Sequence, residues 1–217
     1  LPKAIEERME EGRAEREAAP LEAHGEWAAP GDRPDPVGIL QEQNAVRVPD
    51  LVPIRHGRMI VSPFTFYRGG AGIMAWDLSR TPTTGLRVQC CGDAHLSNFG
   101  VFAAPDRRMV FDLNDFDETL PAAFEWDVKR LVASLVVAAR DNGFRPKEQK
   151  AAARAAAAAY RTAMAAAADM RFLDIWYTRV DAEDLLARLA ESADKASLKA
   201  AEKNMAKARR KTSLGSL

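Results

Sequence analysis

Two acidic loops near the middle of the chain carry the residues best suited to chemistry. The first loop holds Asp93, His95 and Asn98. The second holds several carboxylates and one amide, namely Asp112, Asn114, Asp115, Asp117 and Glu118. Carboxylate and amide oxygens are ligands for hard cations, and Mg²⁺ usually takes one or two carboxylates together with phosphate oxygens. The two loops therefore predict a metal-assisted phosphate site.

A short apolar run at residues 86–91 precedes the first acidic loop. A second short apolar run, at residues 109–113, leads into the second loop and includes Asp112. Both runs are bounded by turn signals, which favours strands over helices. We expect the two strands to be neighbours, so that both loops leave adjacent strand ends. Cys90 and Cys91 are too few for a disulfide framework or a four-ligand zinc site, and are expected to be small buried strand residues.

The spacing within the first loop matches a known arrangement of catalytic side chains. Asp93 and Asn98 have the Asp-x-x-x-x-Asn spacing of the kinase catalytic loop. Phosphoryl transfer uses an aspartate to accept the proton of the attacking hydroxyl and an asparagine to hold Mg²⁺. A further aspartate bridges the metal and the nucleotide phosphates.

Three motifs in order extend this match. They are Gly-Asp-x-His-x-x-Asn at residues 92–98, Asp-Phe-Asp-Glu at 115–118 and Trp-Asp-Val-Lys-Arg-Leu at 126–131. Together they resemble the small-molecule branch of the protein-kinase-like superfamily, which includes aminoglycoside phosphotransferases and choline kinases. The resemblance implies a Mg²⁺-dependent, ATP-using phosphotransferase, or a related nucleotidyl transferase.

The same resemblance gives roles to individual residues. It implies that Asp93 is the catalytic aspartate and Asn98 a metal ligand. Either Asp115 or Asp112 is then the second metal ligand. Asp115 is preferred, because its separation from Asp127 resembles that between the metal-binding aspartate and the aspartate of the following helix in those kinases.

Neighbouring residues are candidates for supporting roles. His95 is grouped with the catalytic aspartate, where it either orients the loop through a backbone hydrogen bond or contacts metal or substrate. Asp117 and Glu118 either extend the metal site or recognise a cationic acceptor. The aspartate of the second loop that does not bind metal is expected to pair with Arg108 or Arg130.

A further set of motifs covers most of the chain between residues 53 and 160. They are Gly57-Arg58-Met59, Ser62-Pro63-Phe64, Phe66-Tyr67-Arg68-Gly69 and the two acidic loops. This set resembles the bacterial domain-of-unknown-function family 2252, an apparently permuted relative of the kinase-like superfamily. The resemblance implies that the Gly-rich loop and the nucleotide-binding lysine follow the catalytic loop. Neither pattern follows Asp115, so we expect this chain to be the N-terminal, catalytic half of a longer protein.

The segment 54–77 mixes arginines, aromatic residues and glycines. Arg58 and Arg68 are candidates for holding the phosphates of a nucleotide, because a guanidinium binds phosphate oxygens in a planar fork. The glycines lack the spacing and the following Lys-Ser/Thr of a P-loop. In the alternative interpretation, residues 62–66 form a turn and a packed strand, and the arginines pair with carboxylates such as Asp77.

The second half of the chain is predicted to be helical. Residues 124–139 have apolar side chains at helical spacing, with Asp127 in the first turn. Asp127 either interacts with the positive end of this helix or holds the loop around Asp93. The Ala-rich residues 146–170 are expected to form a scaffold helix. Residues 182–211 are expected to form one long charged helix.

These elements predict an α+β fold, a helix-rich kinase-like catalytic lobe with a small β element that carries the active loops. We expect a peripheral helix and a Pro/Gly-rich lead-in at residues 1–52, and a partial catalytic lobe at residues 53–180. A charged helix at residues 181–217 is expected to continue into a further part of the protein.

Composition limits the classes of partner. Lys and Arg together number 31, and Asp and Glu together also number 31, so the net charge is zero. No net positive charge therefore attracts nucleic acid or an anionic membrane. No apolar run is long enough to span a membrane and no signal pattern opens the chain, so a cytoplasmic location is expected. The expected ligands are Mg²⁺, ATP or another nucleotide, and an unidentified small-molecule or protein acceptor.

Two other classes of function are compatible with parts of the sequence. The chain could be a non-catalytic, kinase-like module that binds a metal or a nucleotide. The motif Gly-Asp-x-His also opens the binuclear metallophosphoesterase pattern. That pattern needs further metal ligands downstream, whereas the other histidines, His24 and His56, both lie upstream.

Overall fold

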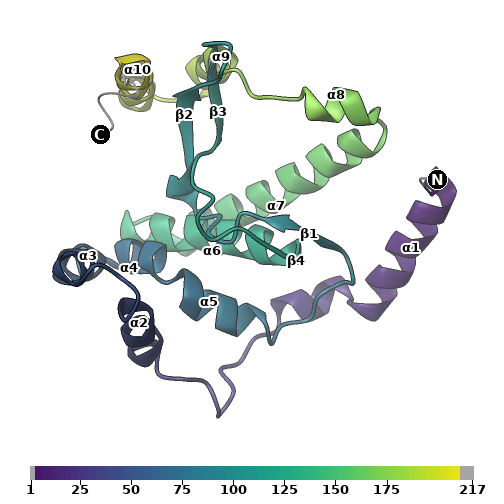
Figure 1. The fold of residues 1–217 in the computed structure, drawn as a ribbon. Helices are drawn as coiled ribbons and strands as arrows, with labels where there is room; N and C mark the ends of the chain where they lie inside the picture. The colour runs from purple at the N-terminus through teal and green to yellow at the C-terminus, as the bar shows by residue number, and fades with distance from the viewer. Residues whose placement is uncertain (1–2, 211–217) are drawn as a thin grey trace. The chain divides into compact units, whose positions relative to one another are not determined.

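The computed structural model describes residues 3–210. Helices dominate, and the strands of the described part form two antiparallel pairs (Figure 1). The predicted fold class, a helix-rich α+β fold with a small β element, is confirmed. The chain divides into two compact units. The first combines the described residues up to Leu96 with Phe116–Ala158, and the second combines Ser97–Asp115 with the described residues from Ala159 onward.

The first unit is mostly helical. Its helices are α1 (Ile5–Ala18), α2 (Pro36–Asn44), α3 (Val52–Met59), α4 (Pro63–Gly69), α5 (Ala71–Leu78), α6 (Glu125–Asp141) and the start of α7 (Pro146–Ala168), with 3-10 turns η1 (Leu21–Gly25) and η2 (Pro49–Leu51). Strands β1 (Arg87–Cys90) and β4 (Leu120–Ala123) pair antiparallel. Leu40, Met59 and Ile73 form a buried apolar cluster that joins α2, α3 and α5.

The second unit is built on a hairpin. Its elements are β2 (Phe99–Ala103), β3 (Met109–Leu113), α8 (Phe172–Trp176), α9 (Ala182–Ser192) and α10 (Lys195–Arg210), with the 3-10 turn η3 (Leu96–Asn98) leading into β2. Strands β2 and β3 pair antiparallel, with Val101 opposite Phe111. Met109, Ala182 and Met205 form the buried cluster beneath this hairpin, so α9 and α10 cover it.

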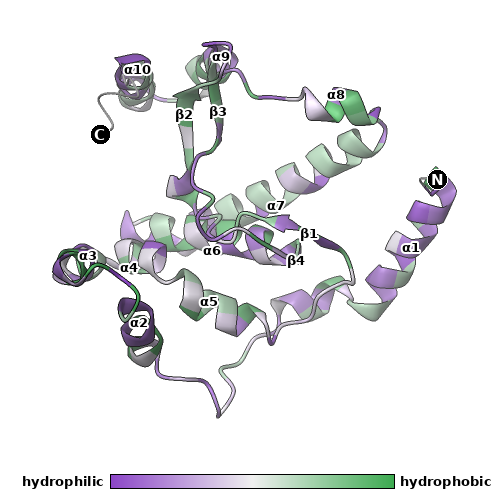
Figure 2. Ribbon diagram, in the orientation of Figure 1, coloured by the Kyte–Doolittle hydropathy of each residue, from purple (hydrophilic) through white to green (hydrophobic). Residues whose placement is uncertain are grey.

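Several predicted elements are confirmed. Helices occur at α6 and α7, and strands at β1 and β3, close to the predicted positions. Helix α1 has no buried residue and is mostly hydrophilic in Figure 2, as expected for a solvated helix. Cys90 and Cys91 are both buried, and neither takes part in a disulfide.

The strand expected at residues 62–66 is wrong, because these residues begin helix α4. Ser62 accepts a hydrogen bond from the backbone N–H of Thr65 (3.2 Å), and the Thr65 hydroxyl accepts one from the N–H of Ser62 (2.8 Å). This reciprocal capping box satisfies two backbone donors at the helix start. Pro63 at the first helical position reinforces it, because its ring fixes a helical φ and it has no N–H to satisfy.

The two acidic loops do not leave neighbouring strands, contrary to expectation. Strand β1 pairs with β4, whereas β3 pairs with β2, so the two strands belong to different sheets. The hairpin of β2 and β3 closes locally across a short turn, where Arg107 has a positive φ of 66°. Local closure costs little chain entropy.

The single long helix expected at residues 182–211 is two helices in the described part. Ala193 is extended, with ψ of 153°, and ends α9. Asp194 then accepts hydrogen bonds from the N–H (2.8 Å) and the hydroxyl (3.2 Å) of Ser197. An aspartate in this position satisfies the first donors of the next helix, so the chain restarts at α10. Lys211 lies outside the described residues.

The predicted division at residues 1–52, 53–180 and 181–217 stays a prediction. Within residues 3–210, no helix combines the length and the hydropathy needed to cross a membrane.

Replacing Ser62 with Ala should lower the free energy of unfolding by about 0.5–2 kcal/mol, because the variant loses the N-cap acceptor of α4. Urea unfolding followed by circular dichroism measures this change. Thr83→Ala, at an exposed position, is the control and should change stability by less than about 0.5 kcal/mol. Equal effects of the two substitutions would show that the cap contributes nothing.

Candidate functional site

Three side chains of α6 hold the first acidic loop within the first unit. Asp127, Arg130 and Ser134 are spaced i, i+3 and i+7, so they lie along one face of the helix. We call these three residues the α6 polar stripe. Their partners are Cys91 and Gly92 for Asp127, Asp93 for Arg130, and Leu96 for Ser134. The loop is thus anchored at both ends and at its central carboxylate.

Asp127 anchors the start of the loop. Its two oxygens accept hydrogen bonds from the backbone N–H groups of Cys91 (2.7 Å) and Gly92 (3.0 Å). Hydrogen bonds from N–H groups to a carboxylate are stronger than those between neutral groups. Asp127 also lies in the first turn of α6. Of its two predicted roles, the contact with the loop is present in the structure, together with a position that suits the helix dipole.

Gly92 allows the backbone to turn just before Asp93. Its φ is +84°, a left-handed conformation that side chains rarely adopt. A Cβ at this position would collide with the backbone carbonyl of Glu118. A glycine is therefore required between the buried end of β1 and Asp93.

Arg130 and Asp93 form the ion pair at the centre of the site. Arg130 Nε donates to Asp93 Oδ1 (2.6 Å), and Arg130 Nη2 also lies against this oxygen. The Arg130 side chain is only 2% exposed and that of Asp93 is 18% exposed. A short, buried pair of this kind fixes the orientation of both side chains.

Tyr67 of α4 completes the surroundings of Arg130. The Tyr67 ring centroid lies 4.6 Å from the guanidinium carbon, a cation–π contact. Its hydroxyl donates to the backbone carbonyl of Arg130 (2.8 Å), and Arg130 Nη2 donates to the carbonyl of Tyr67 (3.1 Å). Burial raises the pKa of Tyr67 to about 12, although the charge of Arg130 opposes this rise. Tyr67 therefore acts as a neutral hydrogen-bond donor.

His95 is buried beside the ion pair. Its Nε2 lies 3.6 Å from Asp93 Oδ2, and its backbone N–H donates to the carbonyl of Asp93 (2.7 Å). Burial lowers the pKa of His95, and the positive charges of Arg130 and Arg68 lower it further, whereas Asp93 opposes the change. The predicted backbone hydrogen bond at His95 is present in the loop.

Two side chains of this site were not predicted. Ser134 is fully buried and accepts the N–H of Leu96 (2.9 Å) while donating to the carbonyl of Leu131 (2.7 Å). Tyr67 holds Arg130. The available signals were a single hydroxyl within an apolar helical run and a tyrosine next to Arg68. Both are weak, because neither fixes a partner in a distant segment.

The arginines proposed for nucleotide binding lie at helix ends in the first unit. Arg58 is exposed in the last turn of α3, and Arg68 is exposed in the last turn of α4. Asp77, the expected partner of these arginines, is instead held by Arg33 through two hydrogen bonds of 2.7 Å. Roles for Arg58 and Arg68 in binding phosphate stay predictions.

The predicted metal ligands lie in the second unit. Asn98 is buried, and its backbone carbonyl accepts the N–H of Asn114 (3.0 Å). Asp112 and Asp115 are exposed, and Asp112 accepts the N–H of Leu113 (2.8 Å). Among residues 3–210, no three His, Cys, Asp or Glu side chains are grouped to hold a metal ion. A shared site of these residues with Asp93 stays a prediction.

The pairing expected between the second loop and Arg108 or Arg130 is not the one observed. Arg108 donates to Asp106 (2.8 Å) within the turn of the hairpin. Arg130 pairs with Asp93 of the first loop, as described above. Arg108 and Asp106 are two residues apart, so pairing them costs little conformational entropy of the chain. This accounts for the local pairing of Arg108.

Asp117 and Glu118 lie in the turn before β4, where both are exposed. The backbone N–H of Thr119 donates to the carbonyl of Phe116 (3.1 Å) and closes this turn. The charge of Glu118 acts on Arg55, whose pKa is lowered by burial and by Arg47 and raised by Glu118. Glu118 therefore has an electrostatic partner, and the acceptor-binding role of both carboxylates stays a prediction.

Comparison with known proteins identifies the family. The family described as "Uncharacterized protein conserved in bacteria (DUF2252)" matches residues 47–217. The chain belongs to this DUF2252 family. The match includes both acidic loops and the α6 polar stripe. No curated protein and no solved structure matches the chain.

Replacing Arg130 with Met in the DUF2252 chain should lower the free energy of unfolding by about 3–5 kcal/mol, because one partner of a buried ion pair is removed. Asp93→Asn should cost much less in the Arg130→Met background than in the wild type, since the partner is already lost. Urea unfolding of the four proteins measures this coupling. Arg140→Met, at the exposed end of α6, is the control. Equal costs for Arg130→Met and Arg140→Met would contradict the assigned role.

The lowered pKa of His95 predicts a loss of stability in mild acid. Below about pH 6.5 the unfolded histidine binds a proton that the folded one does not, so stability falls as pH falls. The loss should be at most about 1.4 kcal/mol per pH unit. Comparing thermal unfolding of wild type and His95→Gln from pH 7.5 to 5 tests this. Parallel curves would contradict the prediction, because the variant should lose less stability in acid.

Proposed function

We propose that this chain is the catalytic half of a kinase-like, Mg²⁺-dependent phosphotransferase, or a related nucleotidyl transferase, that uses ATP and acts on an unidentified small-molecule or protein acceptor. One observation carries the proposal. Asp93 is held at the end of β1 by a loop whose backbone and carboxylate are bonded to Asp127, Arg130 and Ser134. Three side chains of α6 thus fix the position and orientation of one carboxylate.

Phosphoryl transfer places this kind of demand on a protein. Its transition state needs little covalent chemistry from side chains, so catalysis comes mainly from positioning and electrostatic stabilisation. Arg130 holds Asp93 Oδ1, and Oδ2 is the oxygen nearer to His95. In the proposed reaction Asp93 orients the acceptor hydroxyl and receives its proton.

The remaining parts of the proposal concern metal and nucleotide. The amide of Asn98 and the carboxylates of Asp112 and Asp115 are oxygen donors suited to Mg²⁺. A bound Mg²⁺ would neutralise charge that develops on the nucleotide phosphates. Arg58 and Arg68 would supply planar donors for phosphate oxygens.

A non-catalytic module is the second candidate, and the ion pair of Arg130 and Asp93 favours it. Two guanidinium N–H groups already occupy Asp93 Oδ1. A carboxylate bonded in this way holds the loop whether or not it also accepts a proton, as it would in a relative that binds nucleotide without transferring its phosphate.

Isothermal titration of Mg²⁺-ATP into the longer protein, of which this chain is the proposed catalytic half, tests the proposal. Asp115→Asn should weaken binding about tenfold or more, equivalent to about 1.4 kcal/mol, because one metal ligand loses its charge. Asp93→Asn should leave binding within about twofold, because its role is in transfer. Asp106→Asn, which removes an exposed carboxylate paired with Arg108, is the control and should leave binding unchanged.

The other outcomes separate the candidates. Absence of Mg²⁺-ATP binding by the wild type, or indifference to Asp115→Asn, would reject the proposed metal site. The wild type could bind Mg²⁺-ATP and yet release phosphate no faster than Asp93→Asn does. That result would support the non-catalytic module. Two tightly held transition-metal ions in the purified protein would instead indicate a metallophosphoesterase.

A further inference from the structure

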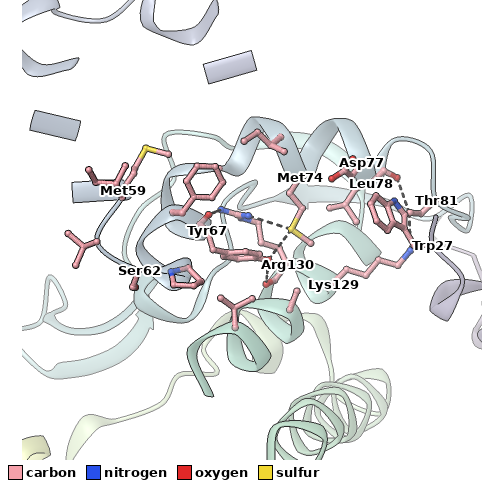
Figure 3. Close-up of a pocket in the computed structure, with 18 of the residues that line it drawn as sticks. Trp27, Met59, Ser62, Tyr67, Met74, Asp77, Leu78, Thr81, Lys129 and Arg130 are labelled. Atoms are coloured by element: carbon pink, nitrogen blue, oxygen red, sulfur yellow. Dashed lines mark hydrogen bonds between the residues drawn. The ribbon is translucent and has the colours of Figure 1, made fainter. Parts of the chain in front are cut away.

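A large pocket in the first unit is lined by none of the residues proposed above to contact metal, nucleotide or acceptor. It has a volume of about 880 Å³ and lies among α4, α5, α6 and the end of α3 (Figure 3). Apolar side chains make up most of its lining, including those of Met59, Phe66, Ile73, Leu78, Ala133 and Val137. Pockets of this size with mostly apolar walls and a few polar groups are typical of small-molecule sites.

Three of the polar side chains that line the pocket gather at one end. In Figure 3, Asp77, Thr81 and Lys129 lie together, whereas Met59 and Ser62 lie at the opposite end. Asp77 is already satisfied by two 2.7 Å hydrogen bonds from Arg33. Its charge is therefore balanced within the protein, which leaves Lys129 as the group at this end best able to select a ligand.

Lys129 is bonded only to neutral oxygens among the contacts of the described residues. Its Nζ donates to the hydroxyl of Thr81 (2.9 Å) and to the carbonyl of Pro82 (3.4 Å). Burial lowers the pKa of Lys129, and the charge of Glu125, one turn earlier on α6, opposes this change. The Glu125 carboxylate itself accepts the N–H of Thr84 (2.8 Å). A half-buried ammonium without a carboxylate in contact favours an anionic ligand.

We propose that this pocket binds an amphiphile with an extended apolar body and a single carboxylate, a molecule of the fatty-acid class. The carboxylate accepts a hydrogen bond from Lys129, and the apolar body extends past Val137 toward Met59. Each methylene group that leaves water adds to the affinity. The apolar walls therefore supply most of the affinity, and Lys129 supplies the selection for the head group.

Three probes with the same alkyl chain test the proposal: dodecanoate, dodecanol and dodecylammonium, each below its micelle-forming concentration. Isothermal titration with the whole chain should show dodecanoate binding about tenfold or more tightly than either other probe, in line with one charge-assisted hydrogen bond. Lys129→Met should abolish this preference and leave dodecanol binding unchanged. Lys129→Arg should restore the preference.

Two controls separate the pocket from the rest of the surface. Arg140→Met removes an exposed cation from the same helix and should leave binding of all three probes unchanged. Ala133→Trp fills the pocket from its apolar wall and should abolish binding of all three, with circular dichroism used to verify folding of every variant. If Lys129→Met does not fold, the wild-type preference and Ala133→Trp still decide the matter.

Each of the following results would overturn the proposal. The first is binding of none of the probes by the wild-type protein, the second is equal binding of all three, and the third is a preference for dodecylammonium, which would assign the head-group end to Asp77. Binding of dodecanoate that survives Ala133→Trp in a folded protein would place it outside this pocket.

Discussion

The buried ion pair between Arg130 and Asp93 is the interaction on which the candidate site depends. Removing two charges from water is costly, and such pairs persist only where geometry and further hydrogen bonds compensate. Here the compensation comes from the ring, hydroxyl and backbone carbonyl of Tyr67 around Arg130, and from His95 beside Asp93. The pair therefore links the end of β1 to α4 and α6. This kind of pairing stabilises one arrangement of a loop over others more than it adds to total stability.

Arg130 also connects the two sites proposed in the first unit. Its guanidinium holds Asp93, and the same residue lines the apolar pocket together with Tyr67 and Met74. Arg130 Nη1 contacts the sulfur of Met74 (3.4 Å), which also accepts the hydroxyl of Tyr67 (2.9 Å). A ligand in the pocket would thus contact the residues that orient Asp93. The packing of the pocket therefore affects the geometry of the candidate site around Asp93.

The second unit has its own means of positioning polar residues. The cluster of Met109, Ala182 and Met205 holds the hairpin of β2 and β3 against α9 and α10. This hairpin carries Asn98 at its start and Asp112 on its second strand. The catalytic candidate and the candidate metal ligands are therefore supported by separate cores.

The sequence by itself determined the local elements and the identity of the first loop. Short apolar runs specified β1 and β3, helical periodicity specified α6, and the Ala-rich run specified α7, because each signal depends only on neighbouring residues. The choice of Asp93 also came from the motif, whereas the requirement for glycine at residue 92 came from its positive φ and the close approach of Glu118 in the structure. The sequence did not determine that β1 pairs with β4, that Arg130 turns toward Asp93, or that Lys129 faces a pocket. Those outcomes depend on which distant segments become buried together, and the apolar spacing of α6 indicates a buried face without indicating which segment will cover it.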